Sequence, residues 1–159
     1  MPTNGDDVYI DNSSIPIYYG LQQSAITLNS LNIAANFTGT IGLPEVTSTG
    51  YVEYRSQFLE IGATTVNIGQ GVGFGSGRIK LNTGAIATTI IVNGTGVSPE
   101  LGLEAFVWKG TNAANVLTVN LGTVGVGVFN NEAASITTLR VSDGTVRCGT
   151  NVSLTTATQ

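Results

Sequence analysis

Residues 65–69 read Thr65-Val66-Asn67-Ile68-Gly69, a short β-branched segment that ends in a glycine. Related segments recur three times, as Val92-Asn93-Gly94, Val119-Asn120-Leu121-Gly122 and Val146-Arg147-Cys148-Gly149. Their final glycines are 25, 28 and 27 residues apart. Self-similarity at such a period is typical of a solenoid, in which each coil stacks on the one before it.

Each repeat predicts two strands and a return segment of variable length. We expect first strands at residues 58–61, 79–82, 106–109 and 139–142, and second strands at residues 65–68, 89–92, 117–121 and 145–148. Glycine supplies the unusual backbone angles that the corners require. Helix is disfavoured, because only residues 24–36 compete and their Thr, Asn and Ile content is weak for a helix. The sequence predicts an all-β fold, a right-handed parallel β-helix with coils of about 25–30 residues.

The chain divides into an N-terminal arm or capping segment over residues 1–24 and a β-solenoid domain over residues 25–159. The arm contains strand-like pieces, and Pro16 excludes its second piece from a central position in a sheet. Residues 154–159 remain strand-like without a polar cap, which predicts an exposed edge at the last coil. We expect either more chain beyond this end or a partner subunit that covers it.

Composition excludes several classes of protein. Charged residues make up only 10% of the 159-residue chain, yet regularly spaced Val, Ile and Leu argue against disorder. No apolar run approaches the roughly 18 residues of a membrane-spanning helix. The net charge is −4 and the six basic residues are scattered, so neither a membrane nor nucleic acid is an expected partner. The N-terminus has no signal-peptide pattern, so we do not expect general secretory export.

The sequence contains no recognisable catalytic motif. The chain has no histidine, which excludes a Ser-His-Asp triad. The glycine-rich residues 69–77 lack both the dinucleotide spacing and the Walker lysine, so a turning return loop explains them better. Asp6, Asp7 and Asp11 do not match a calcium-loop spacing, and an acidic terminus accounts for them. We therefore predict a protein that is not an enzyme and that holds neither a metal nor a cofactor.

The repeat also predicts the surroundings of individual side chains. Glu60 and Lys80 occupy equivalent positions of adjacent first strands, which predicts a cross-strand surface pair rather than paired catalytic acids. Cys148 is equivalent to Ile68 and Leu121, which predicts a small buried hydrophobic residue. Trp108 is left open between an outward ligand-stacking position and an inward core position.

The N-terminal region carries a resemblance. Residues 12–28 read NSSIPIYYGLQQSAITL, followed by LNI at residues 31–33 and FTGTIGLP at residues 37–44. This stretch resembles a segment of uncharacterised structural proteins encoded in tailed-phage genomes. The repeat region is similar in pattern to the β-helical modules of phage decoration proteins, tailspikes and fibres. The resemblance implies a virion component that is assembled in the host cytoplasm.

This resemblance leads to the expectation of a non-enzymatic capsid decoration (cement) protein that acts as a homotrimer and stabilises the assembled head. Its expected partners are the major capsid protein or other virion subunits. The candidate partner-binding residues are Ile15, Ile17, Tyr18, Tyr19, Pro99 and Asn130. The alternative is a tailspike or tail-fibre module that binds a host-surface polysaccharide through Trp108, Tyr51 or Tyr54. A bacterial adhesin is a third possibility, and it would normally need an export signal.

Overall fold

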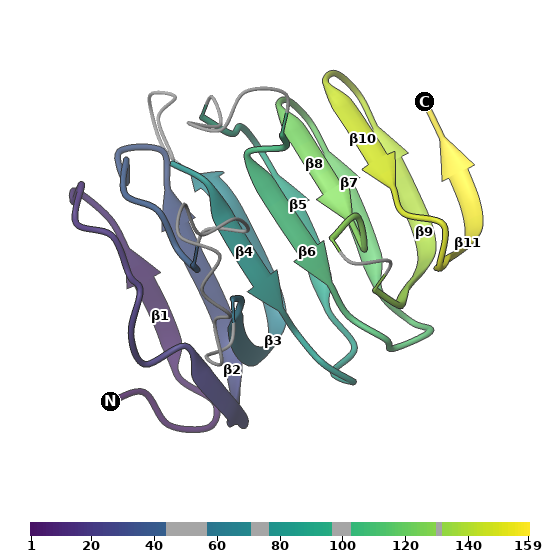
Figure 1. Ribbon diagram of the computed structural model, residues 1–159. Helices are drawn as coiled ribbons and strands as arrows, with labels where there is room; N and C mark the ends of the chain where they lie inside the picture. Colours follow the sequence, from purple (N-terminus) through teal and green to yellow (C-terminus); the bar gives the residue numbers. More distant parts are fainter. Residues whose placement is uncertain (44–56, 71–76, 97–102, 130–131) are drawn as a thin grey trace, which may run out of the picture.

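The computed structural model describes residues 1–43, 57–70, 77–96, 103–129 and 132–159, and it contains one sheet of parallel strands (Figure 1). β-branched and glycine-punctuated segments form these strands, as the alternating pattern predicts. The strands are β1 (Asp7–Ile10), β2 (Gln22–Ala34), β3 (Leu59–Gln70), β4 (Ile79–Asn82), β5 (Thr89–Val92), β6 (Phe106–Lys109), β7 (Val116–Val119), β8 (Thr123–Val126), β9 (Ala134–Val141), β10 (Thr145–Cys148) and β11 (Val152–Thr158). The all-β prediction is confirmed.

The strands form two layers that run side by side along the molecule (Figure 1). β4, β6, β8 and β10 pair in order in the first layer, and β5, β7, β9 and β11 pair in order in the second. β3 belongs to both, because Leu59 and Glu60 pair with β4 while Thr65 to Ile68 pair with β5. The chain passes from one layer to the other and back, which gives a solenoid-like stack of parallel strands.

Inward side chains form stacked columns between the two layers. Ile79, Phe106 and Val124 are opposite one another on β4, β6 and β8, and all three are fully buried. Trp108 is also fully buried, and its Nε1 donates a hydrogen bond of 3.1 Å to Oγ1 of Thr83. This settles the open question about Trp108 in favour of the core. Burial of such a side chain stabilises the fold by about 1.5–3 kcal/mol.

Glycines stack at the corner that follows the second layer. Gly69, Gly122 and Gly144 have φ angles of +73°, +117° and +105°. A Cβ at Gly69 would be 2.3 Å from the carbonyl oxygen of Gly94, and one at Gly144 would be 2.3 Å from that of Gly122. Neither the angle nor the space admits another residue. The predicted corner role is confirmed at Gly69 and Gly122, but the next glycine of this stack is Gly144 rather than Gly149.

The predicted phase of the last repeat is wrong. Residues 139–142 were predicted to continue the first layer, but Leu139 pairs with Leu117 in the second. Residues 145–148 were predicted to continue the second layer, but they form β10 and pair with β8 in the first. The cause is β8 itself, which follows Gly122 directly where a return segment was expected. Paired positions Phe106 and Val124 are therefore only 18 residues apart, below the predicted coil length.

Two side-chain predictions fail with this register. Cys148 pairs with Val126 rather than with the column of Ile68, and it is exposed at the end of the stack instead of buried. Glu60 is opposite Asn82, so the predicted register of Glu60 beside Lys80 is also wrong. Lys80 is buried, and its Nζ donates a hydrogen bond to the carbonyl oxygen of Leu43.

The N-terminal residues join the same sheet. β1 pairs in parallel with β2, with Asp7 opposite Ser30 and Ile10 opposite Ile33. The domain boundary expected at residue 24 falls inside β2, which is continuous from Gln22 to Ala34. Ile17 pairs with Ile41, which in turn pairs with Ile79, so the first layer also begins in this region.

Candidate binding surfaces

A row of polar residues follows the edge where the first layer ends. The strand register places Glu60 of β3 opposite Asn82 of β4, and Asn82 opposite Lys109 of β6. Adjacent strands are about 4.8 Å apart, so a carboxylate, an amide and an ammonium group follow one another at that spacing. All three residues are partly exposed, which makes the row accessible to a ligand.

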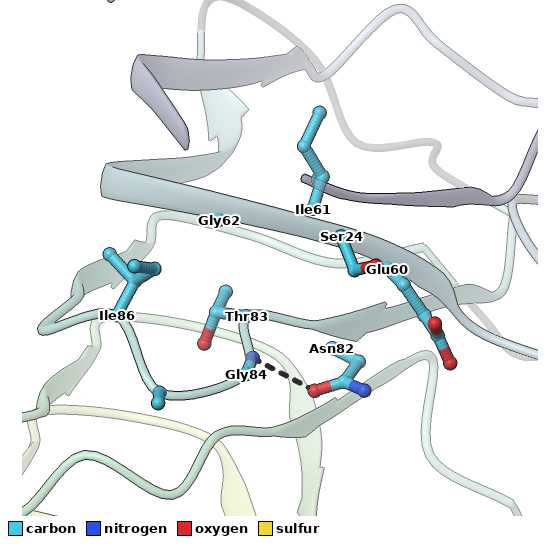
Figure 2. Close-up of a pocket in the computed structure, with 9 residues that line it drawn as sticks. Ser24, Glu60, Ile61, Gly62, Asn82, Thr83, Gly84 and Ile86 are labelled. Atoms are coloured by element: carbon cyan, nitrogen blue, oxygen red, sulfur yellow. Dashed lines mark hydrogen bonds between the residues drawn. The ribbon is translucent and has the colours of Figure 1, made fainter. Parts of the chain in front are cut away.

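A hollow of about 220 Å³ lies beside this row (Figure 2). Oδ1 of Asn82 accepts a hydrogen bond of 2.9 Å from the backbone N–H of Gly84, which turns the amide back toward the loop (Figure 2). Small residues leave the space open, since a Cβ at Gly84 would meet nothing within 4 Å. The lining residues are Ser24, Glu60, Ile61, Gly62, Asn82, Thr83, Gly84, Ala85 and Ile86.

A second hollow of about 370 Å³ shares Asn82 and Gly84 with the first and extends to Lys109, Thr111 and Glu132. Nζ of Lys109 is 2.5 Å from Oε1 of Glu132. Within the described residues, Oε2 of Glu132 is buried without a hydrogen-bond partner. Together the two hollows place carboxylate and amide oxygens beside amide and ammonium donors, groups that can hydrogen-bond a polar ligand.

An ion pair joins the last coil to the body of the stack. Nε of Arg147 on β10 is 2.6 Å from Oε1 of Glu104, which is buried, while the Arg147 side chain is 55% exposed. Arg78 is also buried, and its Nε donates a hydrogen bond of 3.0 Å to the Glu104 carbonyl oxygen. Next to Arg147, partial desolvation raises the pKa of the exposed Cys148 thiol, which favours its protonated form at neutral pH.

The predicted partner-binding residues of the N-terminal region fall into two groups. Ile15 and Tyr19 are 73% and 78% exposed, so their side chains are available to a partner. Ile17 and Tyr18 are half-buried and pack against the core, so they contribute to the packing of the fold. Pro99 and Asn130 lie outside the described residues, as do Tyr51 and Tyr54.

Sequence reasoning missed the row of Glu60, Asn82 and Lys109. Its members come from three separate coils, and only the strand register brings them together. The available signal was the 27-residue separation of Asn82 and Lys109, each directly before a glycine-containing turn. The predicted pairing of Glu60 with Lys80 is two residues away from the observed pairing of Glu60 with Asn82. With that register, Glu60 and Asn82 were not recognised as neighbours.

Two further observations bear on the possible classes of ligand. Across the described ranges, no group of three or more His, Cys, Asp or Glu side chains is placed to hold a metal ion. Asp7 instead accepts hydrogen bonds from Ser30 Oγ and Asn29 Nδ2, which lower the pKa of its carboxyl group. No helix in the described part of the chain is long and apolar enough to cross a membrane.

Comparison with known proteins gives no relative for this fold. No protein-family model matches the chain, and neither a curated protein nor a solved structure matches it.

Proposed function

We propose that the chain is a non-enzymatic virion structural protein, a capsid decoration protein that stabilises the assembled head. The observation that supports this best is the exposure of Ile15 and Tyr19 at one end of a stack of parallel strands. Exposed large apolar and aromatic side chains are the residues that protein interfaces use as anchors. The homotrimer expected from the sequence remains a prediction.

Such a protein would act through mass action. A subunit that binds the assembled shell and not the dissociated capsid protein stabilises the shell by RT ln(1 + L/Kd) per site, where L is the free concentration of the subunit. Regular ladders and stacked columns support this role, because a surface that is already ordered loses little entropy on binding. Neither the polar row nor the exposed residues require a cofactor for this function.

We also propose that the solenoid is wound in the right-handed sense. Connections between parallel strands of one sheet are right-handed in about 98% of cases, because the twist of the strands favours that path. An experimental structure of the protein tests this proposal directly, and a left-handed path of the chain between the two layers would refute it.

The experiment for the capsid role compares shells with and without the protein. We expect bound protein to co-sediment with assembled shells and to raise the temperature at which they lose their contents. Ile15→Ser should reduce co-sedimentation at least tenfold. The matched control Ile91→Ser changes a partly exposed isoleucine of β5 and should bind normally. Shells of equal heat resistance with and without bound protein would rule out a stabilising role.

The second candidate function is that of a polysaccharide-binding module of a tailspike or tail fibre. The polar row and its two adjoining hollows favour it, because sugar hydroxyls are bound by such neighbouring donors and acceptors. Trp108 takes no part, since it is buried in the core. A glycan array tests this reading, with Asn82→Ala expected to lose binding and Asn120→Ala, an exposed asparagine at a corner, expected to keep it. Absence of glycan binding by a protein that co-sediments with shells would reject it.

A further inference from the structure

Both ends of the stack present strand edges. In the described residues, β1 pairs only with β2, while β11 pairs only with β9 and β10 only with β8. β11 is exposed along its length except at Val152, whereas its neighbour β9 buries Ala134, Ile136 and Leu139. Leu154 is opposite Ile136 and is 40% exposed. Free backbone groups with apolar side chains beside them form a template for another parallel strand.

The same columns of inward side chains begin at one end of the molecule and finish at the other. In the second layer, one inward column runs from β1 to β11 without a break in register. Its members are Val8, Leu31, Val66, Ile90, Leu117, Leu139 and Ala157. A strand with the sequence of β1, placed beside β11, therefore continues this column with Val8 after Ala157.

The first layer contains a column of its own that a second molecule would also continue. Its inward column begins at Ile17, which is half-buried, and ends at Val146 on β10. The members between them are Ile41, Ile79, Phe106 and Val124. If a second molecule is placed end to end with the first, its Val8 lies beside Ala157 of the first molecule, and its Ile17 lies beside Val146. One placement therefore continues both layers.

Charge favours contact between opposite ends. Residues 1–54 contain no lysine or arginine, and Asp6, Asp7 and Asp11 are exposed around β1. At the other end, Arg140 is exposed on β9, the exposed Arg147 of β10 is paired with Glu104, and Asp143 is the one exposed acid between these two strands. Two N-terminal ends would repel each other, whereas an N-terminal end and a C-terminal end attract. The complementarity selects a head-to-tail arrangement.

We propose that the edge of β10 and β11 binds the N-terminal edge of a second copy of this chain, in parallel and head to tail. Ala157 is then opposite Val8 of the second copy, and Thr158 is opposite its Tyr9. Arg140 is two strands, about 10 Å, from that tyrosine and close to the second copy's acidic end. This contact is heterologous, so it adds copies in a row unless its geometry closes. It does not rest on the proposed capsid function, and it uses the same N-terminal end of the stack as Ile15 and Tyr19.

The first experiment measures association by sedimentation velocity over a concentration series. Wild-type protein should form elongated dimers and longer rows, and high salt should weaken them because the end charges are screened. Thr158→Glu should lower the association constant at least tenfold, and Thr158→Arg should raise it. The control Thr89→Glu makes the same change at an exposed threonine of β5 at mid-stack, which is not opposite Arg140, and it should change nothing. A monomer at all concentrations, or equal effects at Thr158 and Thr89, would overturn the proposal.

The second experiment tests the register and does not depend on affinity. Ala157→Cys and Val8→Cys are made separately in a Cys148→Ser background, mixed and oxidised. Because paired strands bring Cα atoms within the disulfide range, the mixture should give a disulfide-linked dimer. Each variant alone should give none. Cross-linking of Val8→Cys with itself would show head-to-head contact and refute the arrangement, as would a mixture that stays uncrosslinked while sedimentation shows dimers.

Discussion

At the scale of single residues, the corner glycines show how backbone geometry and stacking act together. Gly69 has a positive φ and also lies directly against the backbone of Gly94. Gly84 has a φ of +60° as well, but the space around it is open. The two positions therefore share the conformational requirement and differ in close approach, so they allow the two contributions to be separated.

We expect Gly84→Ala to lower the free energy of unfolding by about 1–2 kcal/mol, the cost of a side chain in left-handed backbone. Gly69→Ala should lower it by clearly more, because its Cβ would be 2.3 Å from a carbonyl oxygen of the next coil. Denaturant unfolding of both variants measures the difference. Equal losses would show that the corner is free to move apart.

The buried pair of Trp108 and Thr83 gives a second test at this scale. Thr83→Val removes the acceptor of the indole N–H and leaves a buried donor without a partner, which should cost about 1–3 kcal/mol. The double variant Thr83→Val with Trp108→Phe removes both polar groups. Its loss of stability should be smaller than the sum of the two single losses, as measured by a double-mutant cycle. Additive losses would mean that this hydrogen bond contributes nothing.

At the scale of elements, β1 is held to the stack by four paired residues and by the side chain of Asp7, the first of the four. The Asp7 carboxylate accepts hydrogen bonds from Ser30 Oγ at 2.5 Å and from Asn29 Nδ2 at 2.8 Å. These bonds favour the charged form, so they lower the pKa of Asp7 below its ordinary value of 3.8, with Ser30 as the larger cause. Attachment of β1 is thereby linked to pH.

The sign of this linkage follows from the direction of the shift. Because the pKa is lower in the folded protein, the contribution is present above pH 3.8 and is lost as the pH falls through the folded-state pKa. We expect hydrogen exchange of the β1 amides, corrected for intrinsic rates, to lose protection over that range. Asp7→Asn should remove the pH dependence. An unchanged profile in this variant would assign the effect to another group.

At the scale of the whole molecule, stability should vary along the stack. A central coil has neighbours on both sides, whereas β11 pairs only with β9 among the described strands and exposes most of its side chains. Hydrogen exchange at low protein concentration should therefore show the strongest protection in β5 and β7 and the weakest in β11. Uniform protection along the chain would contradict a stack stabilised between neighbours. If copies associate head to tail, protection of β11 should rise with concentration.

The repeat predicted much of this architecture because its signals are local. β-branched segments form strands, and glycines allow the corners, whatever the rest of the chain does. The candidate surfaces were harder to predict. Ile15 and Tyr19 were predicted as partner-binding residues and are exposed, but the row of Glu60, Asn82 and Lys109 depends on the register among three coils. No local property of those residues reports that register.

By itself, the sequence determined that this chain is all-β, that its strands stack in coils and that glycines stand at the corners. Only the tertiary structure decided which residues share a column. It shortened the coil at β8, placed Trp108 in the core and left Cys148 exposed at the end. The physical reason is that a strand is specified by its own residues, whereas its partner depends on how much chain the preceding corner uses. A single missing return segment therefore shifted every later column.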